Sequence, residues 1–288
     1  MQHYSIVTDS GSDISGGTLK KWGVSVANLT FQFDGDNREL VNADMPIGEF
    51  YSRMREGGMS RTAAVNPDGF KALFTPELEA GKDVLCLTLS GGISNTADAA
   101  AQAGAELAEE YPDRKIVVID SLCASAGLAL LIYLALKKRK EGATIEENAA
   151  YIRETIPHLC HWFTVDDLKY LCRNGRVSAS AAFAAGLLGI RPVLHVDDEG
   201  KLINMFKARG RKKSLRAMAD KYTELALDPE EGIYFISHGD CLADAKELEA
   251  MIQADHGHRA TLITDIGPVI GSHSGPGTLA LFFLGKER

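Results

Sequence analysis

Paired cysteines and metal-binding motifs are missing from this sequence of 288 residues. The cysteines stand far apart, so no Cys-x-x-Cys pair occurs, and no His-Glu-x-x-His segment is present. These absences argue against a disulfide framework and a zinc site, and we expect no bound metal. Apolar neighbours favour small buried thiols, which fits a reducing cytoplasm. The cysteines are Cys86, Cys123, Cys160, Cys172 and Cys241.

Long hydrophobic runs and an excess of positive charge are also lacking. The most apolar stretch, Ala126 to Leu136, is followed by Lys137 and spans about a dozen residues, too few to cross a bilayer. Because strand-like residues begin at Tyr4, we expect no signal peptide. The net charge of −8 argues against general binding to nucleic acid or anionic membranes. We therefore expect a cytoplasmic protein without stable membrane insertion.

The order of apolar segments predicts an α/β protein with two domains. Up to residue 157, strands alternate with helices, which indicates a parallel sheet covered on both faces. From residue 158 onward, closely spaced strands and a hairpin at 191–207 predict an α+β domain with a mixed or antiparallel sheet. The predicted domains are 1–157 and 158–288. Helices are predicted at 47–55, 67–79, 96–110, 123–140 and 209–225, with loops at 60–67 and 267–277.

The segment Leu87 to Ala97 is the first candidate binding site. A buried-type strand runs into Gly91 and Gly92, and a helix of small residues follows Ser94. This geometry aims backbone N–H groups and the positive end of a helix at an anion. The glycines would allow close approach of a ligand, and the Ser94 hydroxyl could donate to it. An ordinary capped turn between strand and helix would use the same residue types.

Five stretches, taken in order, resemble the DegV family of bacterial fatty-acid-binding proteins. Each motif is short, but together the five span almost the whole chain. They are Thr8-Asp9-Ser10-Gly11-Ser12-Asp13; Thr62 with Asn66-Pro67; Ser90 to Thr96; Leu168-Lys169-Tyr170-Leu171-Cys172-Arg173-Asn174-Gly175-Arg176-Val177-Ser178; and Gly267-Pro268-Val269-Ile270-Gly271-Ser272-His273-Ser274-Gly275-Pro276-Gly277.

The resemblance implies a long-chain fatty acid of about C14–C18, buried in a slot between two α/β domains. It implies a carrier rather than an enzyme, whose partner is a fatty-acid kinase that phosphorylates the carboxylate. The carboxylate contacts map onto Thr62 and Ser94, with His273 nearby. The family commonly has Thr-Ser-Gln-Pro at 62–65 and Ser-Gly-Thr at 94–96. This chain departs from both patterns, which affects chain-length selectivity and partner identity.

A fatty acid needs an apolar slot and a socket for its carboxylate. Burying about 14 methylenes yields roughly 11 kcal/mol, of which lost translation and rotation cancel several. The hydroxyls of Thr62 and Ser94, with N–H groups at the helix start, could satisfy the carboxylate without a cationic clamp. We expect supporting contacts from Arg176, Asn95, Gly91 and Gly92. The slot is expected to be lined by Phe183, Leu187 and Leu188, from a predicted helix at 179–189 that could equally pack against a sheet.

One dense basic run occurs in this acidic chain. Arg209, Lys212 and Lys213 would share one face of the helix predicted at 209–225, together with Arg216. Such a run is usually a solvated face, but it would also suit docking of an acidic kinase surface. Two of the expected site residues also have other interpretations. Arg176 could form an ion pair at the surface, and His273 could be a structural histidine in a loop.

Two other functions compete with carriage of a fatty acid. The first is a serine hydrolase with Ser94 as nucleophile, His273 as base and Asp9 as the orienting acid. Ser94 lacks the Gly-x-Ser-x-Gly turn that would favour it. The second is a phosphate or nucleotide binder built on the turn at 90–96, which lacks the Gly-Lys-Ser/Thr signature.

Overall fold

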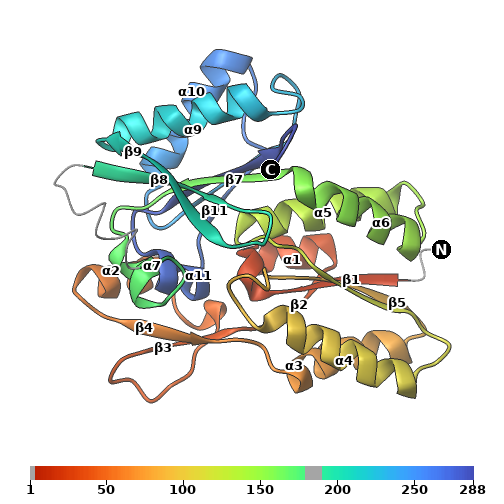
Figure 1. Ribbon diagram of the computed structural model, residues 1–288. Helices are drawn as coiled ribbons and strands as arrows, with labels where there is room; N and C mark the ends of the chain where they lie inside the picture. Colours follow the sequence, from red (N-terminus) through yellow and green to blue (C-terminus); the bar gives the residue numbers. More distant parts are fainter. Residues whose placement is uncertain (1–3, 179–189) are drawn as a thin grey trace.

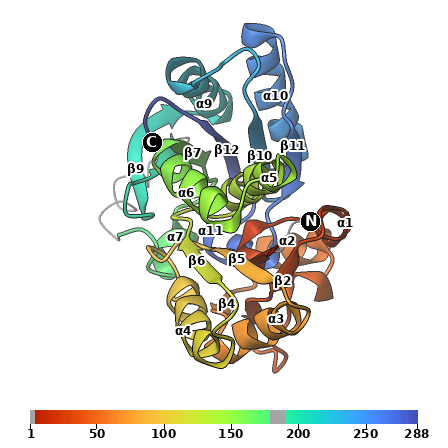
Figure 2. The same ribbon diagram turned by 90° about the vertical axis from the view of Figure 1, so that its right-hand side faces the viewer.

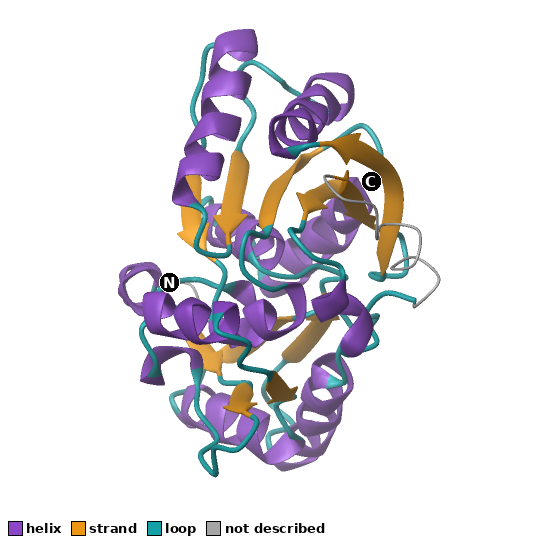
Figure 3. Ribbon diagram, turned by 90° about the vertical axis from the view of Figure 1, so that its left-hand side faces the viewer, coloured by secondary structure: helices purple, strands orange, loops and turns teal. Residues whose placement is uncertain are grey.

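The computed structural model describes residues 4–178 and 190–288, which form two main β-sheets with helices packed against them (Figures 1 and 3). All strands of the first sheet are parallel, as the alternation of strands and helices predicts. The inner strand β5 (Asp83–Thr88) is almost wholly buried, because helices cover both faces of the sheet. In spatial order the strands are β2 (Ser25–Ala27), β1 (Tyr4–Asp9), β5 (Asp83–Thr88) and β6 (Ile116–Asp120).

The second sheet is mixed, which confirms the fold class expected beyond residue 158. Its first two strands in spatial order run parallel, and every other neighbouring pair is antiparallel. The order is β11 (Leu262–Asp265), β10 (Tyr234–His238), β12 (Leu279–Leu284), β7 (Leu159–Thr164), β8 (Ile190–Val196) and β9 (Leu202–Arg209).

Helices form layers outside and between the two sheets (Figures 1 and 2). The outer face of the first sheet is covered by α3 (Pro67–Glu79) and α4 (Thr96–Glu110), and that of the second by α9 (Arg211–Leu225) and α10 (Leu242–His256). Between the sheets lie α5 (Ala126–Lys140) and α6 (Ile145–Thr155), with α1 (Gly16–Trp22) beside them. The short 3-10 helices are η1 (Ser10–Ser12), η2 (Asn42–Asp44) and η3 (Ile156–His158).

Helix α5 joins the two sheets into one hydrophobic core. It is apolar around its whole circumference until its last turn, where the basic residues begin. Its leucines share a core with Leu87 of β5 and Phe282 of β12, one residue from each sheet. Gly127 allows the close approach, because a Cβ there would collide with His161 and lie 2.8 Å from Phe282. Of the helices in the described residues, none is long and apolar enough to cross a membrane.

Local capping signals mark the starts of α6 and α3. Thr144 and Glu147 form a capping box at the start of α6, with hydrogen bonds of 3.2 and 2.8 Å. Asn66 accepts the N–H of Gly69 at 2.8 Å, and Pro67 occupies the first turn of α3. The helix α2 (Ile47–Arg55) and the helices α3 and α4 have the predicted bounds.

Two predicted loops are wrong, and both carry candidate residues. Residues around Thr62 form β4 (Ser60–Ala63), which pairs antiparallel with β3 (Thr30–Phe33). The glycine- and proline-rich segment 267–277 contains the helix α11 (Pro268–Ser274). Contacts with β3, β4 and α2 place α11 against the N-terminal part of the chain, next to α7 (Lys169–Arg173). The predicted helices at 123–140 and 209–225 begin later, at Ala126 and Arg211.

Substitution of Gly127 by alanine should test the packing of α5 between the sheets. We expect Gly127→Ala to lower the free energy of unfolding by about 1–3 kcal/mol, because the new methyl group would overlap His161 and Phe282 and force them to shift. Urea denaturation measures the change. Gly48→Ala in α2 is the matched control, since its Cβ would meet open space, and it should be neutral or stabilise by up to about 1 kcal/mol. Equal effects of the two substitutions would contradict this packing.

Candidate functional site

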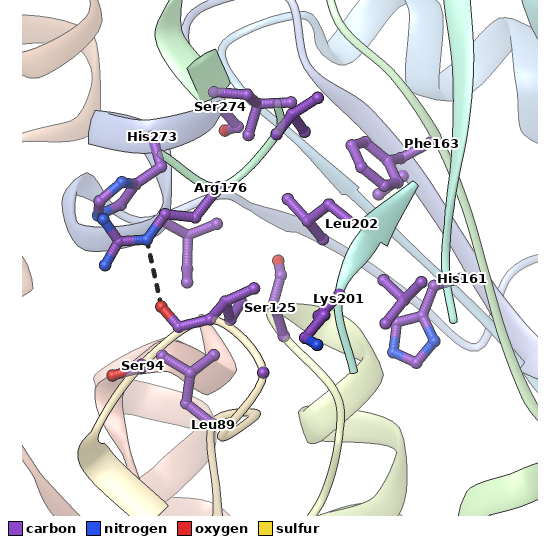
Figure 4. Close-up of a pocket in the computed structure, with 18 of the residues that line it drawn as sticks. Leu89, Ser94, Ser125, His161, Phe163, Arg176, Lys201, Leu202, His273 and Ser274 are labelled. Carbon is purple, nitrogen blue, oxygen red and sulfur yellow. Dashed lines mark hydrogen bonds between the residues drawn. The ribbon is translucent and has the colours of Figure 1, made fainter. Parts of the chain in front are cut away.

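A cavity of about 1210 Å³ lies between the second sheet and the segments that carry Thr62, Ser94 and His273 (Figure 4). Its volume lies somewhat above the range of about 300–1,000 Å³ that is typical of small-molecule sites. Residues of the second sheet line it, together with Thr62 of β4, residues of α11 and residues of the turn before α4. All seven residues predicted for the carboxylate socket and its support line this one cavity: Thr62, Ser94, His273, Arg176, Asn95, Gly91 and Gly92.

Thr62 and His273 meet across the contact between β4 and α11. The Thr62 Oγ1 atom lies 2.8 Å from His273 Nε2, a hydrogen bond whose direction depends on the imidazole tautomer. Burial lowers the pKa of His273 to about 4, and the nearby positive charges of Arg176 and Arg173 act in the same direction. His273 is therefore a neutral imidazole near pH 7, able to donate one hydrogen bond and accept another.

Arg176 lies beside His273 on the same side of the cavity (Figure 4). Its guanidinium is half-buried and donates to the carbonyl oxygens of Ile93 at 3.2 Å and Asn174 at 2.5 Å. Burial lowers the pKa of Arg176, and within residues 4–178 and 190–288 no carboxylate forms an ion pair with it. A half-buried cation without a counter-ion favours an anionic ligand. The structure therefore places a cation, Arg176, in the same cavity as the hydroxyl groups of the expected socket.

The backbone N–H groups of the turn at 90–94 are not free to bind a ligand, contrary to expectation. Gly91 N donates to the Asp120 carboxylate at 3.0 and 3.1 Å, and Gly92 N donates to Ser90 Oγ at 3.1 Å. The N–H groups of Ile93 and Ser94 donate to the Ser90 carbonyl at 3.2 and 3.1 Å. The hydrogen bonds of these N–H groups are therefore used within the protein. Ser94 Oγ is 2.8 Å from Thr96 Oγ1, where either hydroxyl can donate.

Gly91 and Gly92 allow close packing of the protein against itself rather than of a ligand. A Cβ on Gly92 would lie 2.5 Å from the Glu199 carbonyl oxygen and 2.7 Å from the backbone of Gly200. The β8–β9 hairpin tip thus rests directly on the turn that carries Ser94. A hydrogen bond of 2.9 Å from Ser90 Oγ to the Gly200 carbonyl holds this contact. Asn95, also predicted as a supporting residue, is exposed at the edge of the cavity.

The opposite side of the cavity is a largely apolar wall formed by the second sheet (Figure 4). Ala280 of β12 pairs with Phe163 of β7, and Phe282 pairs with His161 in the next inward-facing row. Leu202 of β9 continues this face, and all five residues line the cavity. The sequence prediction missed this wall, because β7 and β12 are buried on both faces and no alternation of apolar and polar residues marks the side that faces the cavity. The residues predicted to line the slot, Phe183, Leu187 and Leu188, lie outside the described residues.

A serine–histidine–aspartate arrangement is not assembled. Ser94 pairs with Thr96, and His273 pairs with Thr62. Asp9 accepts the N–H groups of Gly11 at 2.8 Å and Leu89 at 2.7 Å, and burial raises its pKa to about 7. Asp9 thus joins the ends of β1 and β5 and does not orient His273. Within the part of the chain that the structure describes, no group of three or more histidine, cysteine or acidic residues could hold a metal ion.

The basic run does not form one helical face as predicted. Arg209 is the last residue of β9, and α9 begins two residues later. Arg216 is engaged by Asp220 and Asp255, at 2.7 and 2.5 Å. Lys212 and Lys213 are exposed near the start of α9, and, like Arg209, they form no ion pair with any residue that the structure describes. Three unpaired cations therefore remain exposed where strand β9 meets helix α9.

Similarities to known proteins in sequence and in structure identify the family of this chain. The model of the family described as "Uncharacterised protein, DegV family COG1307" matches residues 3–286. A DegV domain-containing protein of Clostridium perfringens is 38% identical, with 100% of this chain and 99% of that protein covered. A DegV lipid-binding protein from Thermotoga maritima superposes with a TM-score of 0.85 at 30% identity, with both chains fully covered. A stearic acid-binding protein from Eubacterium ventriosum superposes with a TM-score of 0.88 at 26% identity, with 98% of each chain covered. The chain therefore belongs to the DegV family.

Proposed function

We propose that the protein carries a long-chain fatty acid of about C14–C18 in this cavity and acts as a carrier rather than as a catalyst. Residues 1–157 and 158–288 would be two domains that hold the acyl chain between them. The carboxylate would be bound by Thr62, Ser94 and His273, with Arg176 supplying the positive charge. The stearic acid bound by the Eubacterium relative supports this class of ligand.

One observation carries the proposal: an uncompensated half-buried guanidinium faces an apolar wall across the same cavity. The wall of Phe163, Leu202 and Phe282 offers an alkyl chain about 0.8 kcal/mol per buried methylene. Arg176 offers the carboxylate a charge-assisted hydrogen bond, which is stronger than a bond between neutral groups. An amphiphile with one anionic end satisfies both sides at once, whereas a nucleotide or a sugar would leave the apolar wall uncovered.

We further propose that a fatty-acid kinase phosphorylates the bound carboxylate. The polar end of the cavity is the part lined by Thr62, Ser94, Arg176 and His273. It reaches the surface, because Asn95 and Gly175 are exposed and Ser94 is partly exposed. The residues of the apolar wall, by contrast, are mostly buried. A ligand held in this orientation would offer its carboxylate to a partner enzyme while its alkyl chain stays inside.

Native mass spectrometry of the purified protein tests the proposed function. A bound mass of a C14–C18 acid, displaced by added stearate, is the expected result. The protein should also fail to hydrolyse a p-nitrophenyl acyl ester. An apo mass that stays unchanged after incubation with stearate would contradict carriage, and ester hydrolysis abolished by Ser94→Ala would favour the hydrolase instead.

Removal of the Arg176 charge should weaken binding of the acid. We expect Arg176→Leu to raise the Kd for stearate by roughly tenfold to a hundredfold, because a charge-assisted hydrogen bond to the carboxylate is lost. Isothermal titration calorimetry measures the change. Arg259→Leu removes an exposed arginine that does not line the cavity and should leave the Kd unchanged. An unaltered Kd in the Arg176 variant would remove this residue from the site.

Binding of the acid should raise the pKa of His273. Burial lowers this pKa from 6.5 to about 4 in the free protein, and a neighbouring carboxylate would favour the imidazolium form. In the free protein, the free energy of unfolding should fall as the pH drops from about 6.5 towards 4, because His273 binds a proton more tightly in the unfolded chain than in the folded protein. NMR titration of the ring, assigned by loss of its signal in His273→Gln, measures both states. The same pKa with and without stearate would contradict contact with the carboxylate.

The exposed cations at the β9–α9 junction are the proposed docking site for the kinase. Reversing charge at Arg209 and Lys213 should abolish formation of acyl phosphate while stearate binding persists, because an acidic partner surface would be repelled. A coupled assay with a DegV-dependent fatty-acid kinase measures turnover. Reversal at Lys140 and Arg153, which are exposed and distant in the sequence, is the control. Unchanged turnover in the first variant would rule out this docking site.

A further inference from the structure

Two buried serines join β4 to α11 behind the polar end of the cavity. Ser60 Oγ donates to Ser272 Oγ at 2.7 Å, and Ser272 Oγ donates to the Pro268 carbonyl at 2.7 Å. Ser272 is fully buried, and Ser60 is 4% exposed. Neither serine is among the residues that line the cavity, so neither touches a ligand held there. In the sequence, however, Ser60 is two residues from Thr62, and Ser272 is next to His273.

The spacing of these residues makes the serine pair a second connection beside the Thr62–His273 hydrogen bond. Ser60 and Thr62 are two positions apart on β4, so their side chains leave the strand on the same face. Opposite them on α11 stand the consecutive residues Ser272 and His273. Two hydrogen bonds, of 2.7 and 2.8 Å, therefore fix both the distance and the rotation of α11 relative to β4.

The same serine also connects to the loop that carries Arg176. Asn174 Nδ2 donates to the Ser272 carbonyl at 3.0 Å, and an Arg176 N–H donates to the Asn174 carbonyl at 2.5 Å. Ser272 thus stands at a junction of three segments: β4 with Thr62, α11 with His273, and the loop with Arg176. A fully buried hydroxyl at such a junction leaves unpaired polar atoms behind when it is removed.

We propose that Ser272 is a positioning residue for carboxylate recognition, acting through His273 and Arg176 without touching the ligand. This inference rests on the proposed function, because it assigns Ser272 a role in binding the carboxylate end of the same ligand. The hydroxyl holds α11 at the rotation that keeps His273 against Thr62. Its loss should loosen the polar end of the cavity and leave the apolar wall on the second sheet intact.

The experiment compares stearate with methyl stearate, which has the same chain but no anionic end. We expect Ser272→Ala to raise the Kd for stearate about tenfold and to change the Kd for methyl stearate less than twofold. Competition against a fluorescent fatty acid measures both values. Ser214→Ala is the matched control, because Ser214 is also a fully buried helical serine that donates to a carbonyl, that of Arg211, at 2.7 Å. It should change neither Kd.

A double-mutant cycle separates positioning from general damage to the fold. Ser60→Ala should reproduce the selective loss at least in part, and the double variant should lose no more than Ser272→Ala alone, because Ser272→Ala already removes the hydrogen bond that Ser60 donates. Equal weakening of acid and ester in Ser272→Ala would assign the serine a purely structural role, and additive losses would contradict the pair. If the unaltered protein does not prefer the acid over the ester, the proposed function fails first.

Discussion

The hydrogen bond between Thr62 and His273 joins residues that lie 211 positions apart in the chain. It exists because α11, which lies between two strands of the second sheet in the sequence, packs against β3 and β4. Loop-closure entropy opposes such a distant contact, so packing must hold it in place. Val269 of α11 supplies part of that packing, because it is buried in one hydrophobic cluster with Phe31 of β3 and Phe50 of α2. The polar end of the cavity is therefore a property of the assembled molecule and not of any local motif.

The turn before α4 has the sequence pattern of an anion-binding turn, but most of its polar groups make contacts within the protein. A glycine-rich turn at a helix start suggests free N–H groups, yet here Asp120 and Ser90 accept those hydrogen bonds. Gly92 allows contact with the β8–β9 hairpin, where a side chain would meet backbone atoms, and a side chain on Gly91 would meet the Asp120 carboxylate. In the proposed function, recognition of the carboxylate would then fall largely to side chains, with Arg176 as the source of positive charge.

Elements with local signals could be predicted from the sequence. Helices α2, α3 and α4 have the predicted bounds, and Asn66 and Pro67 show why for α3, since a cap and a first-turn proline act within a few residues. Helix α11 was missed because its glycines and prolines favour a loop, while its stability comes from distant partners. Asn42 accepts the Val269 N–H at 3.0 Å, and Gly271 makes room for Tyr51. The wall built by Phe163 and Phe282 depends on strand pairing, which the sequence did not reveal.

The central claim is that one amphiphile fills this cavity, with its carboxylate at the junction of β4, α11 and the Arg176 loop. The most direct measurement is a crystal structure of the protein with stearate. The account predicts carboxylate oxygens within hydrogen-bonding distance of Thr62 or Ser94 and of Arg176, and an alkyl chain against Phe163 and Phe282. A carboxylate bound elsewhere, or an alkyl chain outside the cavity, would contradict it.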